Sequence, residues 1–320
     1  MEKGEGKNET YITEFIRLGF GNHAELQHLL FLLFLVTYIV TMAGNILIIA
    51  LVVTDRHLHT PMYFFLENLS CLETSLSSTI LPRMLVGFLT GDKNISVTFC
   101  ITQFYFLSLF VRVECYLLAL MSYDRYLAKC KPLHYTGLMK VRICLQLAVV
   151  CQMNGFIIVT IVICLMSQLH FCGPNKINHF LCDFTPMIKL SCSDTSLITL
   201  VTFILSFLGT LPPFLLTLMS YIFIISTILR IPSTIGRRKA FYTCSSHLIV
   251  VTIYYATLII VYMLPDTDTL RDLNKVFSLF YTVLTPLANP FIYSLRNRDV
   301  KETLSKVISK YIKLIEIEKQ

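Results

Sequence analysis

The sequence predicts an all-α membrane protein, a seven-transmembrane helix bundle followed by a short amphipathic eighth helix. Of its 320 residues, 55% are hydrophobic and only 15% are charged, and the mean hydropathy is +0.66. These values exclude a soluble domain with a charged surface. Seven apolar runs are long enough to cross a hydrocarbon core of ~30 Å. They cover residues 26–53, 61–88, 98–128, 143–167, 197–230, 239–264 and 273–296.

The length of these runs predicts helices rather than the strands of a membrane barrel. Barrel strands need only ~10 residues and alternate between polar and apolar side chains. Each run here is much longer and is apolar on every face. Helices of this length satisfy their own backbone hydrogen bonds within lipid, so a helical bundle is the expected fold.

Basic residues set the predicted orientation of the chain. The loops at 54–60, 129–142 and 230–239 and the tail after Tyr293 are rich in Lys and Arg, and such segments stay on the cytoplasmic side. We expect a multi-pass protein of the plasma membrane with an extracellular N-terminus at 1–25, a seven-transmembrane domain at 26–296, and a cytoplasmic eighth helix and tail at 297–320. The N-terminal sequon Asn8-Glu9-Thr10 predicts a glycan at Asn8.

The remaining composition narrows the class of function. The net charge of +7 is accounted for by cytoplasmic loops that face anionic membrane lipids, so we expect no nucleic-acid partner. The chain has no Gly-rich phosphate loop and no Ser/His/Asp or metal-ligand spacing in its outer half. We therefore expect neither an enzyme nor a cofactor.

A charged triplet, Asp124-Arg125-Tyr126, ends the third run and is followed by a basic loop. A permanently charged guanidinium at the edge of hydrocarbon persists only where it is paired or functional. Asp124 is the adjacent partner for Arg125, so the triplet predicts a functional site at the cytoplasmic end of the third helix.

Four cysteines are expected on the oxidising side of the membrane, namely Cys100, Cys172, Cys182 and Cys192. They allow three disulfide pairings, and the spacing alone does not choose between them. His179, Cys182 and Asp183 also have the residue types of a transition-metal site. A cysteine held in a disulfide cannot bind a metal, so we expect no metal here.

A helix rises ~1.5 Å per residue. This rise places two carboxylates, Glu73 and Glu114, near the middle of the second and third helices. Either desolvation keeps one or both protonated, or a small cation and the amides of Asn45 and Asn289 hold their charge. An ion-coupled transporter would use such a pair, but the chain has no internal repeat and no paired broken helices.

Arg112 lies in the outer half of the third helix, and its offset of two residues turns it away from Glu114. One interpretation is that it faces the interior of the bundle and meets an anionic ligand or Glu73. The other is structural pairing or snorkelling of the side chain to the membrane surface, with no role in ligand binding.

Several separated motifs resemble those of one family over nearly the whole chain. In order they are Gly44-Asn45; Pro61-Met62-Tyr63-Phe64-Phe65-Leu66 with Leu69-Ser70 and Glu73; Met121–Tyr126 with Pro132-Leu133-His134-Tyr135; Ser220-Tyr221; Lys239-Ala240-Phe241 with Thr243-Cys244-Ser245-Ser246-His247; and Asn289-Pro290-Phe291-Ile292-Tyr293-Ser294-Leu295-Arg296-Asn297. Their joint order and spacing resemble the odorant (olfactory) receptors, which are rhodopsin-like G-protein-coupled receptors.

The resemblance implies the disulfides Cys100–Cys182 and Cys172–Cys192. It also implies that a small volatile odorant activates a heterotrimeric G protein of the stimulatory, olfactory type and raises cyclic AMP, with membrane lipids and trafficking chaperones as further partners.

The implied coupling and activation residues are Asp124, Arg125, Tyr126, Tyr221, Asn289, Pro290 and Tyr293. The implied ligand-binding residues are Leu107, Ser108, Val111, Arg112, Leu205, Ser206, Tyr255, Leu258, Ile259, Tyr262 and Leu279. The alternatives are a class A receptor for a small lipid or carboxylate metabolite, and an ion-coupled transporter.

Overall fold

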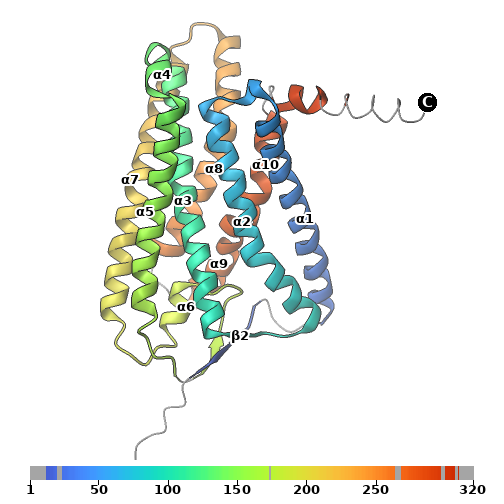
Figure 1. Ribbon diagram of the computed structural model, residues 1–320, viewed down its shortest axis with the longest axis vertical. Coiled ribbons are helices and arrows are strands. Elements are labelled where there is room, and N and C mark those ends of the chain that lie inside the picture. The colour runs from blue at the N-terminus through green and yellow to red at the C-terminus, as the bar shows by residue number, and fades with distance from the viewer. Residues whose placement is uncertain are drawn as a thin grey trace, which may run out of the picture.

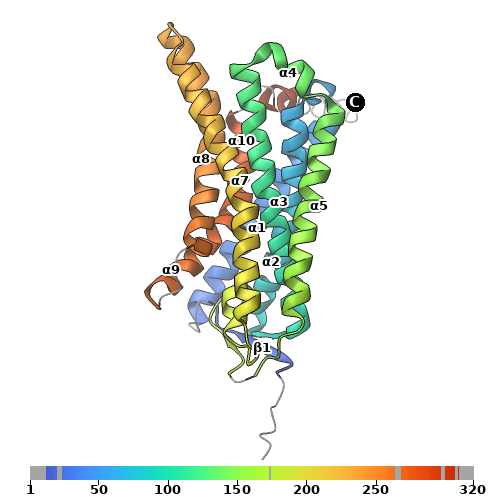
Figure 2. The same ribbon diagram turned by 90° about the vertical axis from the view of Figure 1, so that its left-hand side faces the viewer.

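The computed structural model describes residues 12–19, 24–172, 174–263, 268–296, 300–306 and 309 of the chain. Long helices run side by side along the long axis of the molecule, with short strands at one end and the short helix α4 at the other (Figures 1 and 2). We call these the sheet end and the α4 end.

The helices follow the apolar runs closely. The long ones are α1 (Ala24–Thr54), α2 (Pro61–Thr90), α3 (Val97–Cys130), α5 (Val141–Met166), α7 (Ser196–Leu229) and α8 (Thr234–Met263). The last run is divided into α9 (Asp268–Leu279), a π-helical turn (Phe280–Leu284) and α10 (Thr285–Arg296). Short elements join them: a 3₁₀ turn (Arg56–Leu58), α4 (Pro132–Leu138) and α6 (Phe184–Ile188).

Local signals explain where several helices begin and end. α2 begins with Pro61, whose missing N–H costs nothing in the first turn, and it ends at Gly91, which adopts a left-handed φ of 70°. α3 begins after Ser96, whose hydroxyl accepts a hydrogen bond from the Phe99 N–H. The end of α2 and the start of α3 flank β2, so they fix the path of the chain at the sheet end.

Four of the described helices, α1, α3, α5 and α7, are long and apolar enough to cross a membrane, and α8 is a fifth when its two parts, bent by 46°, count as one span. Large apolar side chains point outward from them, including Leu29, Leu32, Val150 and Leu208, each more than half exposed. Lipid is the solvent that matches such a surface.

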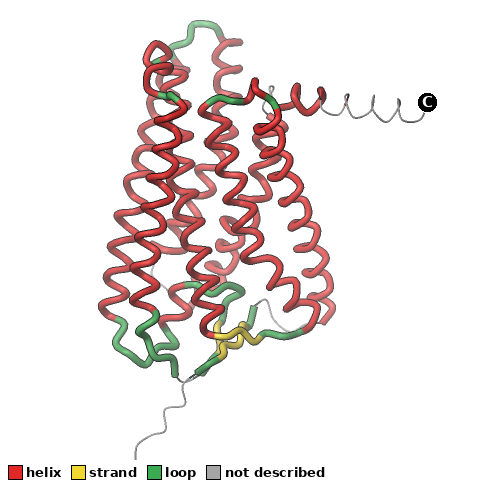
Figure 3. The backbone as a smooth tube through the Cα atoms, viewed as in Figure 1, coloured by secondary structure: helices red, strands yellow, loops and turns green. Residues whose placement is uncertain are grey.

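A three-stranded sheet of order β2-β1-β3 covers one end of the bundle (Figure 3). β1 (Glu14–Arg17) pairs antiparallel with β2 (Asn94–Ser96) and parallel with β3 (Lys176–Ile177). Phe15 and Arg17 of β1 point inward and are buried. The sequence did not predict this sheet, which ties the N-terminal segment to two loops far along the chain.

Residues 300–306 continue after α10 in helical conformation. Val300 and Thr303 are buried there, and the Thr303 hydroxyl donates a hydrogen bond to Asp55 at 2.8 Å. Asp55 precedes the 3₁₀ turn that follows α1. The start of the tail is therefore packed against the α4 end of the bundle.

Candidate functional site

A cavity of about 270 Å³ lies between α3, α7, α8 and α9, and residues of α6 line it as well. Most of its surface is apolar, but seven of the seventeen lining residues carry a hydroxyl group, one carries an amide and one a guanidinium. The lining residues are Phe104, Ser108, Val111, Arg112, Cys115, Phe184, Thr185, Thr199, Thr202, Phe203, Ser206, Thr210, Leu258, Ile259, Val261, Tyr262 and Asn274. An apolar wall with few convergent polar groups is typical of a small-molecule site.

Seven of the eleven residues implied as ligand-binding line this cavity: Ser108, Val111, Arg112, Ser206, Leu258, Ile259 and Tyr262. The structure places the other four elsewhere. Leu107 is 1% exposed in the core, and Leu279 packs against that core. The Leu205 carbonyl accepts a long hydrogen bond of 3.4 Å from Arg112. Tyr255 is buried behind the cavity and donates to the Cys115 carbonyl at 3.0 Å.

Sequence reasoning missed most of the α7 wall of the cavity. Thr199, Thr202, Ser206 and Thr210 follow one another at three or four residues and all line it, a spacing that places them on one helical face. This stripe of hydroxyl residues was the available signal. Phe184 and Thr185 were also missed because they come from α6, in the long loop after α5.

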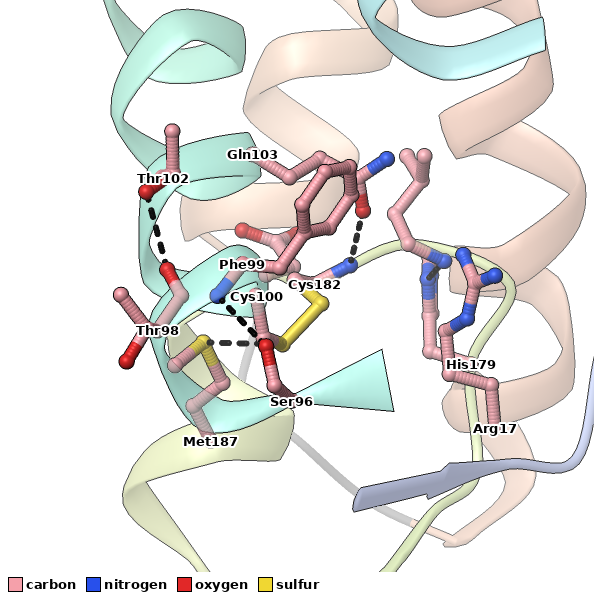
Figure 4. Close-up of a disulfide and its surroundings, with 12 residues drawn as sticks. Arg17, Ser96, Thr98, Phe99, Cys100, Thr102, Gln103, His179, Cys182 and Met187 are labelled. Atoms are coloured by element: carbon pink, nitrogen blue, oxygen red, sulfur yellow. Dashed lines mark hydrogen bonds between the residues drawn. A yellow bond between two sulfur atoms is a disulfide. The ribbon is translucent and has the colours of Figure 1, made fainter. Parts of the chain in front are cut away.

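Two disulfides hold the 168–196 loop over the sheet end of the bundle. Cys100 at the start of α3 is bonded to Cys182, with Cα atoms 5.4 Å apart, and Cys172 is bonded to Cys192, with Cα atoms 5.8 Å apart. Gln103 reinforces the first link, since its side-chain oxygen accepts from the Cys182 N–H and its amide donates to the Thr79 carbonyl (Figure 4). The loop is thereby fixed to α2 and α3.

The residues considered for a metal site have other partners in this loop. Cys182 is in its disulfide, and His179 Nδ1 accepts a hydrogen bond of 3.0 Å from the Leu181 N–H. Burial and the nearby Lys275 charge lower the pKa of His179 to about 4. The imidazole is therefore neutral at physiological pH, as an accepting Nδ1 requires.

Asp183 connects the loop to the helices that carry the cavity. Its carboxylate accepts from the Phe184 N–H at 2.7 Å and from the Tyr262 hydroxyl at 3.4 Å, and Tyr262 also contacts the Tyr281 hydroxyl at 3.1 Å. The side chain is buried at 5% exposure. Burial raises the pKa of Asp183 to about 6, although both hydrogen bonds favour the charged form.

We expect the stability of the protein to fall as the pH rises toward neutrality because of Asp183. Its pKa in the folded state lies above that of a model carboxyl group, so folding takes up a proton between about pH 4 and about pH 6. The stabilisation is complete below this window and is lost as the pH rises through about 6. Melting temperatures of the purified protein should fall from pH 5 to pH 7.5 more steeply in wild type than in Asp183→Asn, and equal slopes would contradict the assignment.

At the α4 end, residues of the charged triplet contact two other helices, α4 and α7. The Asp124 carboxylate accepts a hydrogen bond of 2.9 Å from the Tyr135 hydroxyl of α4. Tyr126 packs against Phe223 of α7 with ring centroids 5.7 Å apart, and Arg125 is 9% exposed. Tyr221 of α7 is hydrogen-bonded to His247 Nδ1 of α8. The contact between Tyr221 and His247 joins the two helices next to the triplet.

The middle of the bundle holds a buried polar cluster. Asn289 of α10 donates to Glu73 of α2, and Asn45 of α1 donates to the Pro286 carbonyl at 3.2 Å. One carboxylate oxygen of Glu73, both of Glu114 and the side-chain oxygens of the two asparagines have no hydrogen-bond partner. Gly44 lets α1 and α10 meet here, because a Cβ at this position would lie 2.8 Å from Cβ of Pro290.

For two of the predicted functional residues, the structure does not describe the side chain. Asn8 falls outside the described residues. The backbone of Tyr293 belongs to α10, but its side chain is not among those described.

These features define a multi-pass helical membrane protein with a ligand-sized cavity close to its disulfide-bonded end. A sequence profile of the family described as "Olfactory receptor" matches residues 34–311. The chain is 48% identical to human Olfactory receptor 6B1 over 94% of its own length and 96% of that protein. It is 48% identical to human Olfactory receptor 11L1 over 95% of its length and 94% of that protein, and 46% identical to mouse Olfactory receptor 5AP2 over 96% and 97%.

The chain therefore belongs to the olfactory receptor family, a family of G-protein-coupled receptors that are multi-pass membrane proteins and not enzymes. The family resemblance of the sequence motifs is confirmed, and these relatives support a role as an odorant receptor.

Proposed function

We propose that this protein is an odorant receptor of the plasma membrane that binds small volatile molecules in the cavity between α3, α7 and α8. Binding activates a stimulatory, olfactory-type G protein and raises cyclic AMP. The cavity of about 270 Å³ carries the proposal, because seven of its lining residues are those that the family resemblance implies. Trafficking chaperones would assist its delivery to the membrane.

The chemistry of the wall supports a small, largely apolar ligand. Val111, Phe203, Leu258 and Ile259 supply apolar surface, and a ligand gains ~25 cal/mol per Å² of apolar area buried. The hydroxyls of Ser108, Ser206 and Tyr262 offer orienting hydrogen bonds. A volatile of modest size can fill such a space with one or two polar contacts.

The proposed topology has seven spans with the N-terminus outside. The apolar helices α1, α3, α5, α7 and α8 supply five of them. α2 carries Glu67, Glu73 and Arg83, which lower its mean hydropathy, and the last span is divided by the π-helical turn between α9 and α10. Basic residues gather at the α4 end and the disulfides at the other, which suits a cytoplasmic C-terminus and an extracellular N-terminus carrying a glycan at Asn8.

The contacts at the α4 end support a closed signalling surface. Arg125 lies beside Asp124 and Tyr126 in α3, and the contact between Tyr221 and His247 holds α7 against α8. Agonist binding would favour a second packing in which the end of α8 moves away and exposes Arg125 and Tyr221 to the G protein. Asn289, Pro290 and Tyr293 would let α10 repack in the same step.

Cyclic AMP in cells that express the receptor with trafficking chaperones tests this function. Screening a panel of small volatiles should give dose-dependent signals in wild type, and Arg125→Ala should abolish them at a matched surface level. Lys129→Ala serves as the charge-loss control, because Lys129 lies four residues after Arg125 and fourteen residues beyond Cys115, the last α3 residue that lines the cavity. Signals that persist in Arg125→Ala, or silence of well-expressed receptor across the panel, would contradict the proposal.

The buried polar cluster fits a proton or a small cation such as sodium. Its unpartnered oxygens belong to Glu73, Glu114, Asn45 and Asn289, and oxygen ligands suit a hard cation. We expect sodium to lower the basal cyclic AMP signal when it replaces choline, because the cation would favour the closed packing. Glu73→Gln should lose this sodium response at equal surface level, and an unchanged response would exclude the cluster as the cation site.

A further inference from the structure

Arg112 is a charged side chain placed among the lining residues of an otherwise largely apolar cavity. It is half-buried in α3. Its guanidinium donates a long hydrogen bond of 3.4 Å to the Leu205 carbonyl of α7 and also interacts with the Tyr116 hydroxyl, one turn further along α3. Gly209 makes room for it, since a Cβ at that position would overlap the guanidinium. The absence of a side chain at Gly209 therefore provides the space that the Arg112 guanidinium occupies.

No acidic partner for Arg112 occurs within the described part of the chain, where the ion pair found is Arg83 with Asp92. Glu114 is fully buried toward the polar cluster rather than toward the cavity. Asp183 is adjacent to Cys182, which is bonded to Cys100, twelve residues before Arg112 on α3. This separation corresponds to ~18 Å along the helix, so Arg112 lies well inside the bundle relative to the loop. Asp183 does not line the cavity and is linked to its wall through the hydrogen bond from Tyr262.

Three hydroxyl residues on α3 and α7, the two helices that hold the guanidinium, line the same cavity. The Thr202 hydroxyl is buried and has no hydrogen-bond partner. Ser108, one turn before Arg112, and Ser206, one turn after Thr202, also line the cavity. Helical serines and threonines usually satisfy their hydroxyls on the carbonyl one turn earlier, so an unpartnered Thr202 is a donor left available for a ligand.

We propose that the cavity binds a small carboxylate whose head group pairs with Arg112 and the hydroxyls of Ser108, Thr202 and Ser206. The hydrocarbon part then extends along Leu258 and Ile259 of α8. This inference rests on the proposed odorant-receptor function and specifies its ligand class. The fork of a guanidinium matches a carboxylate in two hydrogen bonds.

The charge of the ligand distinguishes a carboxylic acid from its methyl ester in this cavity. Short aliphatic acids are ionised at neutral pH, since model carboxyl groups titrate at ~4. A methyl ester of the same chain fills the same apolar volume but leaves the arginine without a counter-ion. Losing one partner of a desolvated, hydrogen-bonded charge pair lowers affinity by roughly 30-fold or more, so acid and ester should differ by at least that factor.

Ligand-induced stabilisation of purified full-length receptor tests the proposal. The probes are straight-chain carboxylates from pentanoate to nonanoate and their methyl esters, each titrated at pH 7.4 while the melting temperature is followed. In wild type the acids should bind roughly 30-fold more tightly than the esters. Arg112→Gln should remove this preference, and Arg112→Lys, which keeps the charge without the fork, should retain part of it.

Gly209→Ala provides a variant that keeps every charged and polar group. Alanine favours the helix, and its methyl group displaces the guanidinium, so carboxylate binding should weaken while ester binding is unchanged. Equal affinities of acids and esters for wild type, or an acid preference that survives in Arg112→Gln, would overturn the proposal. Cyclic AMP responses to neutral volatiles would then still uphold the odorant-receptor function, whereas silence to acids and neutral volatiles alike would remove both.

Discussion

Replacing Cys182 by alanine is expected to remove most of the folded receptor from the cell surface. Its disulfide to Cys100 closes a segment of 82 residues, and a link of that span stabilises a fold by about 4 kcal/mol. Marginal native stability leaves little reserve for such a loss. The loop that carries Asp183, Phe184 and Thr185 would also lose its attachment to α3, so the cavity would lose its cover.

Surface immunostaining of an N-terminally tagged receptor, set against total protein, measures this effect. Cys164→Ala is the matched control, because Cys164 is a free and exposed cysteine near the end of α5. Cys100→Ala should reproduce the loss, and the double variant should be no worse than either single one since all three break the same bond. Normal surface levels of Cys182→Ala would show that the disulfide is dispensable.

The membrane helices were predictable because lipid imposes a long apolar run on each of them. The run at 98–128 corresponds to α3 (Val97–Cys130), and the run at 143–167 corresponds to α5 (Val141–Met166). The observed ends differ by one or two residues, because polar residues such as Ser96 cap the helices without being apolar themselves. Capping depends on a local hydrogen bond, which hydropathy does not register.

The sheet was not predictable from the sequence because its strands are short and distant. β1 has four residues and β3 has two, and their partners lie far apart in the chain. A run of four residues carries too little alternation to indicate a strand. The bridging contact between Phe15 of β1 and Phe171 of the loop, with ring centroids 5.3 Å apart, arises only after the loop has folded back.

Most of the residues expected for the site on α3 and α8 line the cavity, whereas on α7 only Ser206 of the expected residues does. Motifs fix the register of α3, so Ser108 and Arg112 could be placed on the cavity side. On α7, the neighbouring prolines Pro212 and Pro213 interrupt the regular helix, and few motif residues fix its register. Its hydroxyl residues Thr202 and Thr210 were therefore overlooked although they line the cavity.

Helix α3 connects the outer disulfide, the cavity and the signalling surface. Cys100, Arg112, Glu114 and Arg125 lie along its length, and it packs against α2, α5 and α7. A ligand that pulls on Arg112 therefore acts on a helix whose outer end is held by a covalent bond. Under the proposed mechanism, movement on ligand binding is expected at the partner helices α7 and α8, which are joined by the hydrogen bond between Tyr221 and His247.

Replacing Asn289 by leucine is expected to cost about 2–4 kcal/mol of stability, while replacing Glu73 and Asn289 together by leucine should cost less than the two single changes combined. Both residues are almost fully buried, and the Asn289 amide donates to the Glu73 carboxylate. One carboxylate oxygen of Glu73 already has no hydrogen-bond partner. Removing the Asn289 donor alone leaves the other oxygen without a partner as well. Removing both groups leaves neither the Glu73 carboxyl group nor the Asn289 amide buried without its partner.

Thermal unfolding of the purified receptor, with the two single variants and the double variant, completes this cycle. A coupling of about 1–3 kcal/mol between the two positions is expected for residues in direct hydrogen-bonded contact. Thr54→Leu is a matched control, because Thr54 is exposed at the end of α1 and bonds only to its own helix. If the losses at Glu73 and Asn289 simply add, the amide does not stabilise the carboxylate. The cluster would then be held by α1 and α2 rather than by the α10 contact through which the receptor is proposed to switch.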